Sequence, residues 1–101
     1  MPNIDIENAR RTEMRWVILR ALYAAQPLGT SEMIVLNTIE PVIPDATAMD
    51  IRRELDYLAD RGLAEVNSNR PVWAAKINHR GIDVVEYTVD CHPGIARPKK
   101  W

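Results

Sequence analysis

The chain has 101 residues, of which 47% are hydrophobic and 27% charged, and its formal net charge is −1. These values are ordinary for one globular domain and exclude a protein that binds nucleic acid through its overall charge. No segment approaches the ~18 apolar residues of a membrane span, no signal peptide is recognisable at the start, and a single cysteine excludes an intrachain disulfide framework. We therefore expect a cytoplasmic protein without membrane association.

The first predicted element is a helix over about residues 5–25. Apolar residues recur there at steps of three and four, which is typical of an amphipathic helix. Trp16, Leu19 and Tyr23 lie on a second face, so the helix is apolar on more than one side. Such a helix is either sandwiched in the core or shared with a second subunit. We predict a homodimer that uses these three side chains, with the sandwiched helix as the alternative.

A second helix follows a break at Pro27 and Gly29, because proline cannot continue a helix and glycine favours a turn. Thr30 or Ser31 can cap its start by accepting a hydrogen bond from a free backbone N–H. Pro41 ends it, and an apolar connection leads on to the third helix.

The clearest helical pattern in the chain begins at Thr47 and ends at Gly62. Ile51, Leu55 and Leu58 recur at steps of three and four, which places them on one narrow stripe. Thr47 can cap the start, and Gly62 suits the end, where a positive φ closes a helix.

Two short strands are predicted after this helix, at residues 63–67 and 72–77, because both segments are rich in β-branched and apolar residues. Residues 68–71 between them have turn composition. Asn78 can cap a short final helix. From residue 88 onward the sequence loses periodicity and becomes basic.

The passage from the third helix into the first strand resembles the winged helix-turn-helix superfamily. Residues 55–63 are similar to its "L-x-x-L-x-x-x-G-L" signature, and residues 77–81 look like a variant of its "Leu-Thr-x-x-Gly" phrase, with Asn78 in place of threonine. The resemblance covers about residues 10–87. It extends to the multiple-antibiotic-resistance, phenolic-acid and arsenic-repressor types and to small phage-encoded winged-helix proteins.

The resemblance implies an α+β fold of the winged helix-turn-helix class, with a three-helix core, a two-stranded β-hairpin wing and a short C-terminal helix. The winged-helix domain would cover residues 1–87 and a basic C-terminal tail residues 88–101. The implied function is double-stranded DNA binding as a dimeric transcriptional regulator.

The expected DNA contacts come from the third helix, the wing and the tail. Arginine can bind a guanine edge or a phosphate, and wing arginines suit a narrow minor groove. Tail lysines would add salt-dependent phosphate contacts. The predicted DNA-binding residues are Thr47, Arg52, Arg53, Tyr57, Arg70, Lys76, Arg80, Lys99 and Lys100.

The distribution of charge supports an alternative. Residues 45–65, which include the third helix, carry −3, whereas residues 66–101 carry +3. Asp50 and Asp56 are spaced to form surface ion pairs with Arg53, and acidic neighbours repel phosphates. The alternative is a non-enzymatic protein-interaction module, such as a phage accessory or assembly protein. It would use the apolar first helix, the acidic third helix and the tail, which Trp101 would anchor on a neighbouring subunit.

Cys91 and His92 are adjacent in the sequence, which raises the question of a metal site or a catalytic thiol. A metal needs three or four ligands, but His79 is the only other histidine and there is no second cysteine. A catalytic thiol needs a positioned base and an oxyanion hole, and no motif indicates either. We predict no enzyme activity, no metal and no cofactor.

Overall fold

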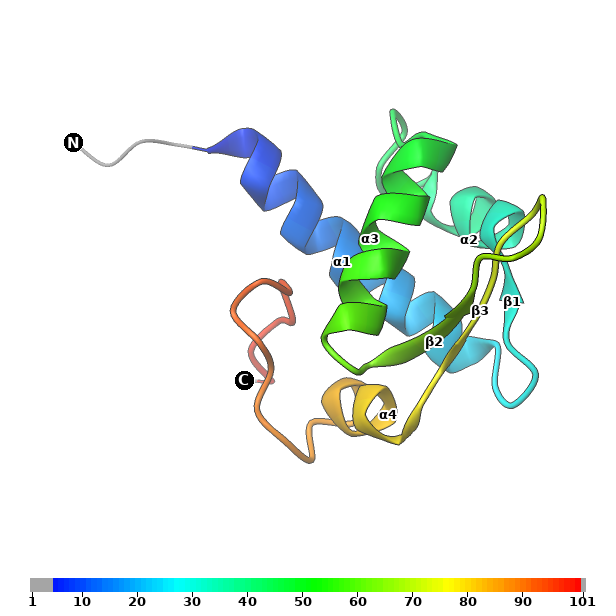
Figure 1. Ribbon diagram of the computed structural model, residues 1–101. Helices are drawn as coiled ribbons and strands as arrows, with labels where there is room; N and C mark the ends of the chain where they lie inside the picture. Colours follow the sequence, from blue (N-terminus) through cyan, green and yellow to red (C-terminus); the bar gives the residue numbers. More distant parts are fainter. Residues whose placement is uncertain (1–4, 101) are drawn as a thin grey trace.

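The chain folds into an α+β arrangement of helices around a small sheet, shown in Figure 1, and the computed structural model describes residues 5–100. Within these residues there are four helices and one three-stranded antiparallel sheet. In chain order the elements are α1 (Ile6–Ala24), β1 (Thr30–Ser31), α2 (Glu32–Ile39), α3 (Ala48–Asp60), β2 (Ala64–Asn67), β3 (Ala74–Ile77) and α4 (His79–Val85).

The helix starts agree with the caps predicted from the sequence. The side chain of Ser31 accepts a hydrogen bond from the backbone of α2, and that of Asn78 does the same for α4. Thr47 and Asp50 form a reciprocal capping box at the start of α3, which satisfies two otherwise free N–H groups. Gly62 has φ +73° just after α3, as its predicted role requires.

The sheet has the order β1-β3-β2, so the hairpin of β2 and β3 carries β1 on its open edge. Thr30 pairs with Ala75, and Val66 pairs with Ala75 from the other side. Strand β1 was not predicted. Gly29 makes the pairing possible, because it has φ +80° and a Cβ there would collide with the backbone of Ala75.

Helix α1 is sandwiched inside the chain, since it contacts α2, α3, α4 and β3. Trp16 is 6% exposed and Leu19 is fully buried. These two predicted dimer contacts are therefore core residues of a single chain, and a second subunit would not reach them. Tyr23 is half-buried, and its hydroxyl donates a 2.6 Å hydrogen bond to Glu86. Trp101 lies outside the described residues.

The C-terminal segment, residues 88–100, packs against the helices. Ile95 is 5% exposed and belongs to the hydrophobic core. The N–H of Ala96 donates to the carbonyl of Thr12 in α1, and Arg97 donates to the carbonyl of Val84 in α4. The boundary predicted after residue 87 thus does not mark the end of the packed chain.

Across residues 5–100, no helix combines the length and the apolar character needed to cross a membrane.

Candidate nucleic-acid interface

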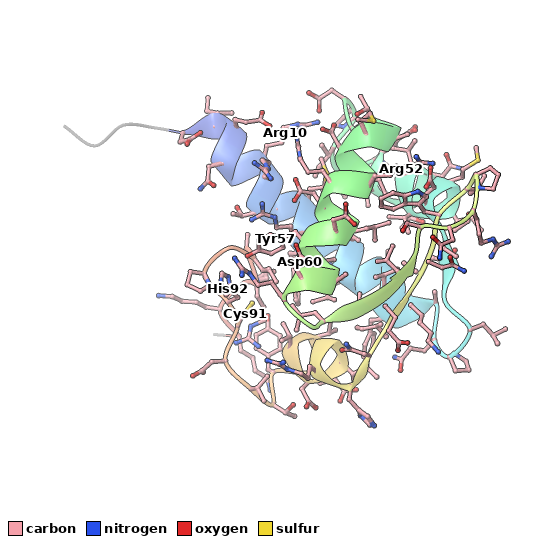
Figure 2. The ribbon with its side chains drawn as sticks, in the orientation of Figure 1. Arg10, Arg52, Tyr57, Asp60, Cys91 and His92 are labelled. Carbon is pink, nitrogen blue, oxygen red and sulfur yellow. The ribbon has the colours of Figure 1, made fainter. Side chains whose placement is uncertain are left out.

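Helix α3 carries the two arginines expected to contact DNA, and both are held by other groups of the protein. Figure 2 shows Arg52 on the side of α3 that faces the β2–β3 hairpin. Arg52 Nε lies 3.1 and 3.0 Å from the two carboxylate oxygens of Glu32, which is itself nearly buried in α2. Nη2 of Arg52 donates to the carbonyl of Pro71, 2.9 Å away. The guanidinium also stacks on Trp73, 4.8 Å from the ring centroid. Arg52 therefore joins α2, α3 and the β2–β3 hairpin.

Arg53 is held within α3 itself. Its Nε donates to Glu54 and its Nη2 donates to Asp50, each at 3.1 Å. The pair with Asp50 was expected from the sequence spacing, whereas the pair expected with Asp56 does not form. Its side chain keeps 43% of its surface exposed, so Arg53 is both fixed and accessible.

Glu54 is the functional neighbour that the sequence analysis missed. It is fully buried and accepts hydrogen bonds from Arg15 at 2.8 Å, from Arg11 at 3.0 Å and from Arg53. A signal was present, because position 54 falls on the same helical stripe as Ile51 and the other core residues of α3. A charged residue at such a position needs partners, and the arginines of α1 supply them.

The electrostatics of this cluster favour the ionised carboxylates. Burial alone would raise the pKa of Glu54, but the hydrogen bonds from Arg15, Arg11 and Arg53 outweigh it and leave the pKa below its ordinary value. The pKa of Asp50 is also lowered. Burial opposes this shift, and the bonds from the backbone of Thr47 and from Arg10 produce it.

Tyr57, another residue expected to contact DNA, is half-buried and meets the C-terminal segment through its hydroxyl. The hydroxyl lies 2.9 Å from Nδ1 of His92. The guanidinium of Arg15 lies over its ring at 3.7 Å from the centroid, and that of Arg61 at 4.8 Å. Thr47, another predicted contact, uses its hydroxyl in the cap of α3.

The predicted wing residues lie along the hairpin and its exit. Arg70 is exposed in the turn between the two strands, Lys76 points outward from β3, and Arg80 is exposed in α4. None of the three forms an ion pair with another residue of the described chain. They are thus available for phosphate contact. However, Glu65 lies opposite Lys76 in the strand pair, and its negative charge partly offsets the positive charge of the lysine.

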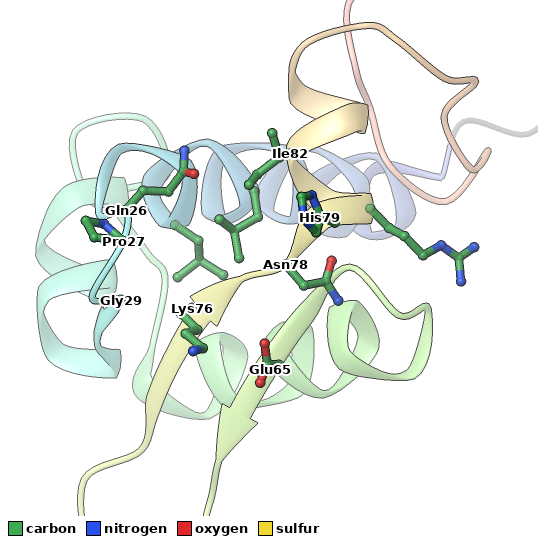
Figure 3. A pocket seen from close by; sticks show the side chains of 11 residues that line it. Gln26, Pro27, Gly29, Glu65, Lys76, Asn78, His79 and Ile82 are labelled. Carbon is green, nitrogen blue, oxygen red and sulfur yellow. The ribbon is translucent and has the colours of Figure 1, made fainter.

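An open pocket of about 480 Å³ lies beside these residues, between the end of α1, the sheet and the start of α4 (Figure 3). Lys76 and Arg80 bring positive charge to its rim, and Glu65 brings negative charge. No buried side-chain polar atom in residues 5–100 lacks a hydrogen-bond partner, so none points into this pocket awaiting a ligand.

The two tail lysines differ in their surroundings. Lys99 is exposed, whereas the ammonium of Lys100 lies 5.7 Å from the ring centroid of Tyr87. Arg97 also lies over this ring, at 4.3 Å. This end of the segment therefore packs on the protein through Tyr87.

The environment of Cys91 does not suit a nucleophile. Burial raises the pKa of its thiol above the ordinary value, and a nearby Arg97 offsets this only in part. The thiol contacts the backbone carbonyls of His92 and Ile95. Among residues 5–100 there is no group of three or more His, Cys, Asp or Glu side chains that would hold a metal ion.

Comparison with known protein families, curated proteins and solved structures finds no match to this chain.

Proposed function

We propose that the chain is a winged-helix module that binds double-stranded DNA, with α3 as the recognition helix and the β2–β3 hairpin as the wing. The order of elements supports the proposal, because α3 leads through Gly62 directly into a two-stranded hairpin, and β1 extends the sheet beside it.

The observation that carries the proposal is the fixed yet accessible state of Arg52 and Arg53. Each uses Nε and Nη2 to bind acceptors within the protein, and neither Nη1 hydrogen-bonds to any residue between 5 and 100. Nη1 carries two N–H groups that suit a phosphate or a guanine edge. Since the ion pairs already restrict both side chains, less rotamer freedom is lost when DNA binds.

Acidic groups on the same face limit the strength of this interaction. Asp56 and Asp60 are exposed on α3 and have no ion-pair partner in the described part of the chain. They would repel phosphates, so we expect weak binding to random sequence that falls steeply with salt. Arg70, Lys76 and Arg80 would supply the phosphate contacts that offset this repulsion.

The test is binding of the full chain to a random-sequence duplex at roughly 50 and 200 mM salt, followed by fluorescence anisotropy. Arg53→Ala and Arg70→Ala should each weaken binding. Each should also reduce by about 1 the steepness with which the logarithm of the binding constant falls with the logarithm of the salt concentration. Arg20→Ala is the matched control, because Arg20 is an exposed arginine of α1 on neither proposed element. Absence of binding at the lower salt concentration, or equal losses in all three variants, would contradict the proposal.

A second candidate is a protein-interaction module that uses the outer face of α3. The observation that favours it is the side chain of Met49, which is 76% exposed on the helix that also presents Asp56 and Asp60. Replacing both aspartates by lysine separates the two functions. For a DNA-binding helix the double variant should bind duplex DNA more tightly, whereas for a protein-facing helix duplex binding should stay absent.

We further propose that the protein acts as a dimeric transcriptional regulator, formed from two copies of this chain. Because Trp16 and Leu19 are buried within one chain, the contact between subunits would use other surfaces.

A further inference from the structure

Arg15 connects the C-terminal segment to α3 through two hydrogen bonds. Its Nε donates to Oε1 of Glu54 at 2.8 Å, and its Nη1 donates to the carbonyl of Gly94 at 2.9 Å. The Arg15 side chain is only 9% exposed. One buried guanidinium therefore binds a carboxylate of α3 with one nitrogen and the backbone of residue 94 with another.

A second set of contacts holds the same part of the segment against α3. Nδ1 of His92 lies 2.9 Å from the Tyr57 hydroxyl and accepts a 3.0 Å hydrogen bond from the N–H of Gly94. A Cβ at position 94 would overlap the Tyr57 hydroxyl, so any larger residue there would force Tyr57 or the segment to shift. The segment is thus positioned closely against Tyr57 and Arg15.

The connection continues from Glu54 to the exposed face of α3. Oε1 of Glu54 binds Arg15, whereas Oε2 accepts from Arg11 at 3.0 Å and from Arg53 at 3.1 Å. The carboxylate is fully buried, so losing these partners would leave a buried charge uncompensated, at a large cost in free energy. A rotation of the carboxylate would move both oxygens at once.

We propose that docking of residues 91–95 positions Arg53 for DNA, with Arg15 and Glu54 as the positioning residues between them. The inference rests on the proposed function for its DNA-binding consequence, but the coupling between the segment and Arg53 is a property of the free protein. When the segment leaves, Arg15 loses its Gly94 acceptor and is held by Glu54 alone. The Glu54 carboxylate can then rotate together with Arg15, and this rotation moves the Oε2 acceptor away from Arg53.

The coupling has a reciprocal consequence, because binding free energies at two linked sites affect each other equally. A partner that captured residues 91–95 would lower the affinity for DNA, although these residues supply no DNA contact. In return, bound DNA would slow hydrogen exchange at the N–H of Ala96, which reports docking through its bond to Thr12.

The first experiment measures Arg53 in the full chain without DNA. NMR follows exchange of the Arg53 Nε–H with water in the wild type, in Gly94→Ala and in Arg15→Lys. Gly94→Ala places a methyl group against the Tyr57 hydroxyl. Arg15→Lys keeps the charge but has a single nitrogen for two acceptors. Both variants should accelerate the exchange by about tenfold, as expected for the loss of one charge-assisted hydrogen bond.

Rescue and control variants separate this coupling from general loss of structure. Tyr57→Phe removes the hydroxyl that the new methyl group meets, so Tyr57→Phe combined with Gly94→Ala should return Arg53 exchange toward its wild-type rate. Lys99→Ala removes an exposed charge of the same segment and should leave Arg53 exchange at its wild-type rate. Unchanged Arg53 exchange in both Gly94→Ala and Arg15→Lys would overturn the inference.

The second experiment measures duplex binding with the wild type, Gly94→Ala and the rescued double variant, and uses Arg20→Ala as the control. Gly94→Ala should weaken binding by about tenfold, the double variant should recover it, and Arg20→Ala should match the wild type. If the variants accelerate Arg53 exchange but the wild type binds no DNA, the proposed function is contradicted. The coupling between the segment and Arg53 is then still supported. Wild-type DNA affinity in a Gly94→Ala protein with accelerated Arg53 exchange would overturn the positioning role.

Discussion

Nε of Arg15 in α1 donates a 2.8 Å hydrogen bond to Oε1 of Glu54 in α3, and both side chains are buried. This ion pair joins the first helix to the third inside the core, where an unpaired charge is costly. It therefore affects the stability of the fold as well as the position of Arg53.

Removing Glu54 should destabilise the protein severely, because three arginines would lose their shared acceptor and Arg15 would stay buried without a countercharge. We expect Glu54→Ala to lower the free energy of unfolding by about 3–5 kcal/mol, measured by urea denaturation. Glu65→Ala is the control, since Glu65 is exposed on β2, and it should change stability by less than about 0.5 kcal/mol. If the two variants lost similar amounts of unfolding free energy, the buried cluster around Glu54 would contribute little to stability.

Stability should fall in acid because the folded-state pKa values of Glu54 and Asp50 are lowered. A carboxyl group with a lowered folded pKa stabilises the protein above its unfolded pKa, and this contribution is lost as the pH falls through the folded pKa. For Glu54 the loss begins near its unfolded value of about 4.3. Urea midpoints from about pH 7 to about pH 3 should therefore decrease at the acidic end, and less steeply in Glu54→Gln. An equally steep decrease in that variant would assign the acid sensitivity to other groups.

The C-terminal segment should contribute to stability through Ile95. This side chain is 5% exposed among core residues, so Ile95→Ala should cost about 2–5 kcal/mol by loss of burial and creation of a cavity. Lys99→Ala, four residues later and exposed, should be close to neutral. If both variants matched the wild type in urea denaturation, the segment would not be part of the cooperative fold.

Trp16 should stabilise the single chain whether or not a dimer forms. It is 6% exposed and packs edge-on against Tyr87, with 6.4 Å between ring centroids. Trp16→Ala should cost about 3–5 kcal/mol. The cost should not depend on protein concentration, and sedimentation should give the same oligomeric state as for the wild type. A variant that dissociated without loss of monomer stability would instead place Trp16 between subunits.

Several features of the fold could be predicted because they depend on neighbours in the sequence. The caps Thr47 and Asn78 were identified correctly, and Ser31 is one of the two caps considered for α2, since a capping side chain binds backbone only a few residues away. The helix stop at Gly62 follows from the same local geometry. The hairpin was also located, although each strand is shorter than expected.

Other features were not predicted because they depend on residues distant in the sequence. Strand β1 has two residues, too few for an alternating pattern, and exists because Ala74 and Ala75 of β3 pair with it. Likewise, the partners of Glu32 lie 20 or more positions away from it in the sequence. In the folded chain it accepts hydrogen bonds from Arg52 and from the backbone of Trp73.

The sequence by itself determined where the helices begin and where the hairpin lies, because caps, turns and periodicity act over a few residues. Only the tertiary structure decided which charges are buried, which arginines are held and where the C-terminal segment packs. Glu54 shows the reason. A glutamate in a helix is ordinarily a surface residue, and it occupies the core here because Arg11 and Arg15, some forty positions earlier, compensate its burial.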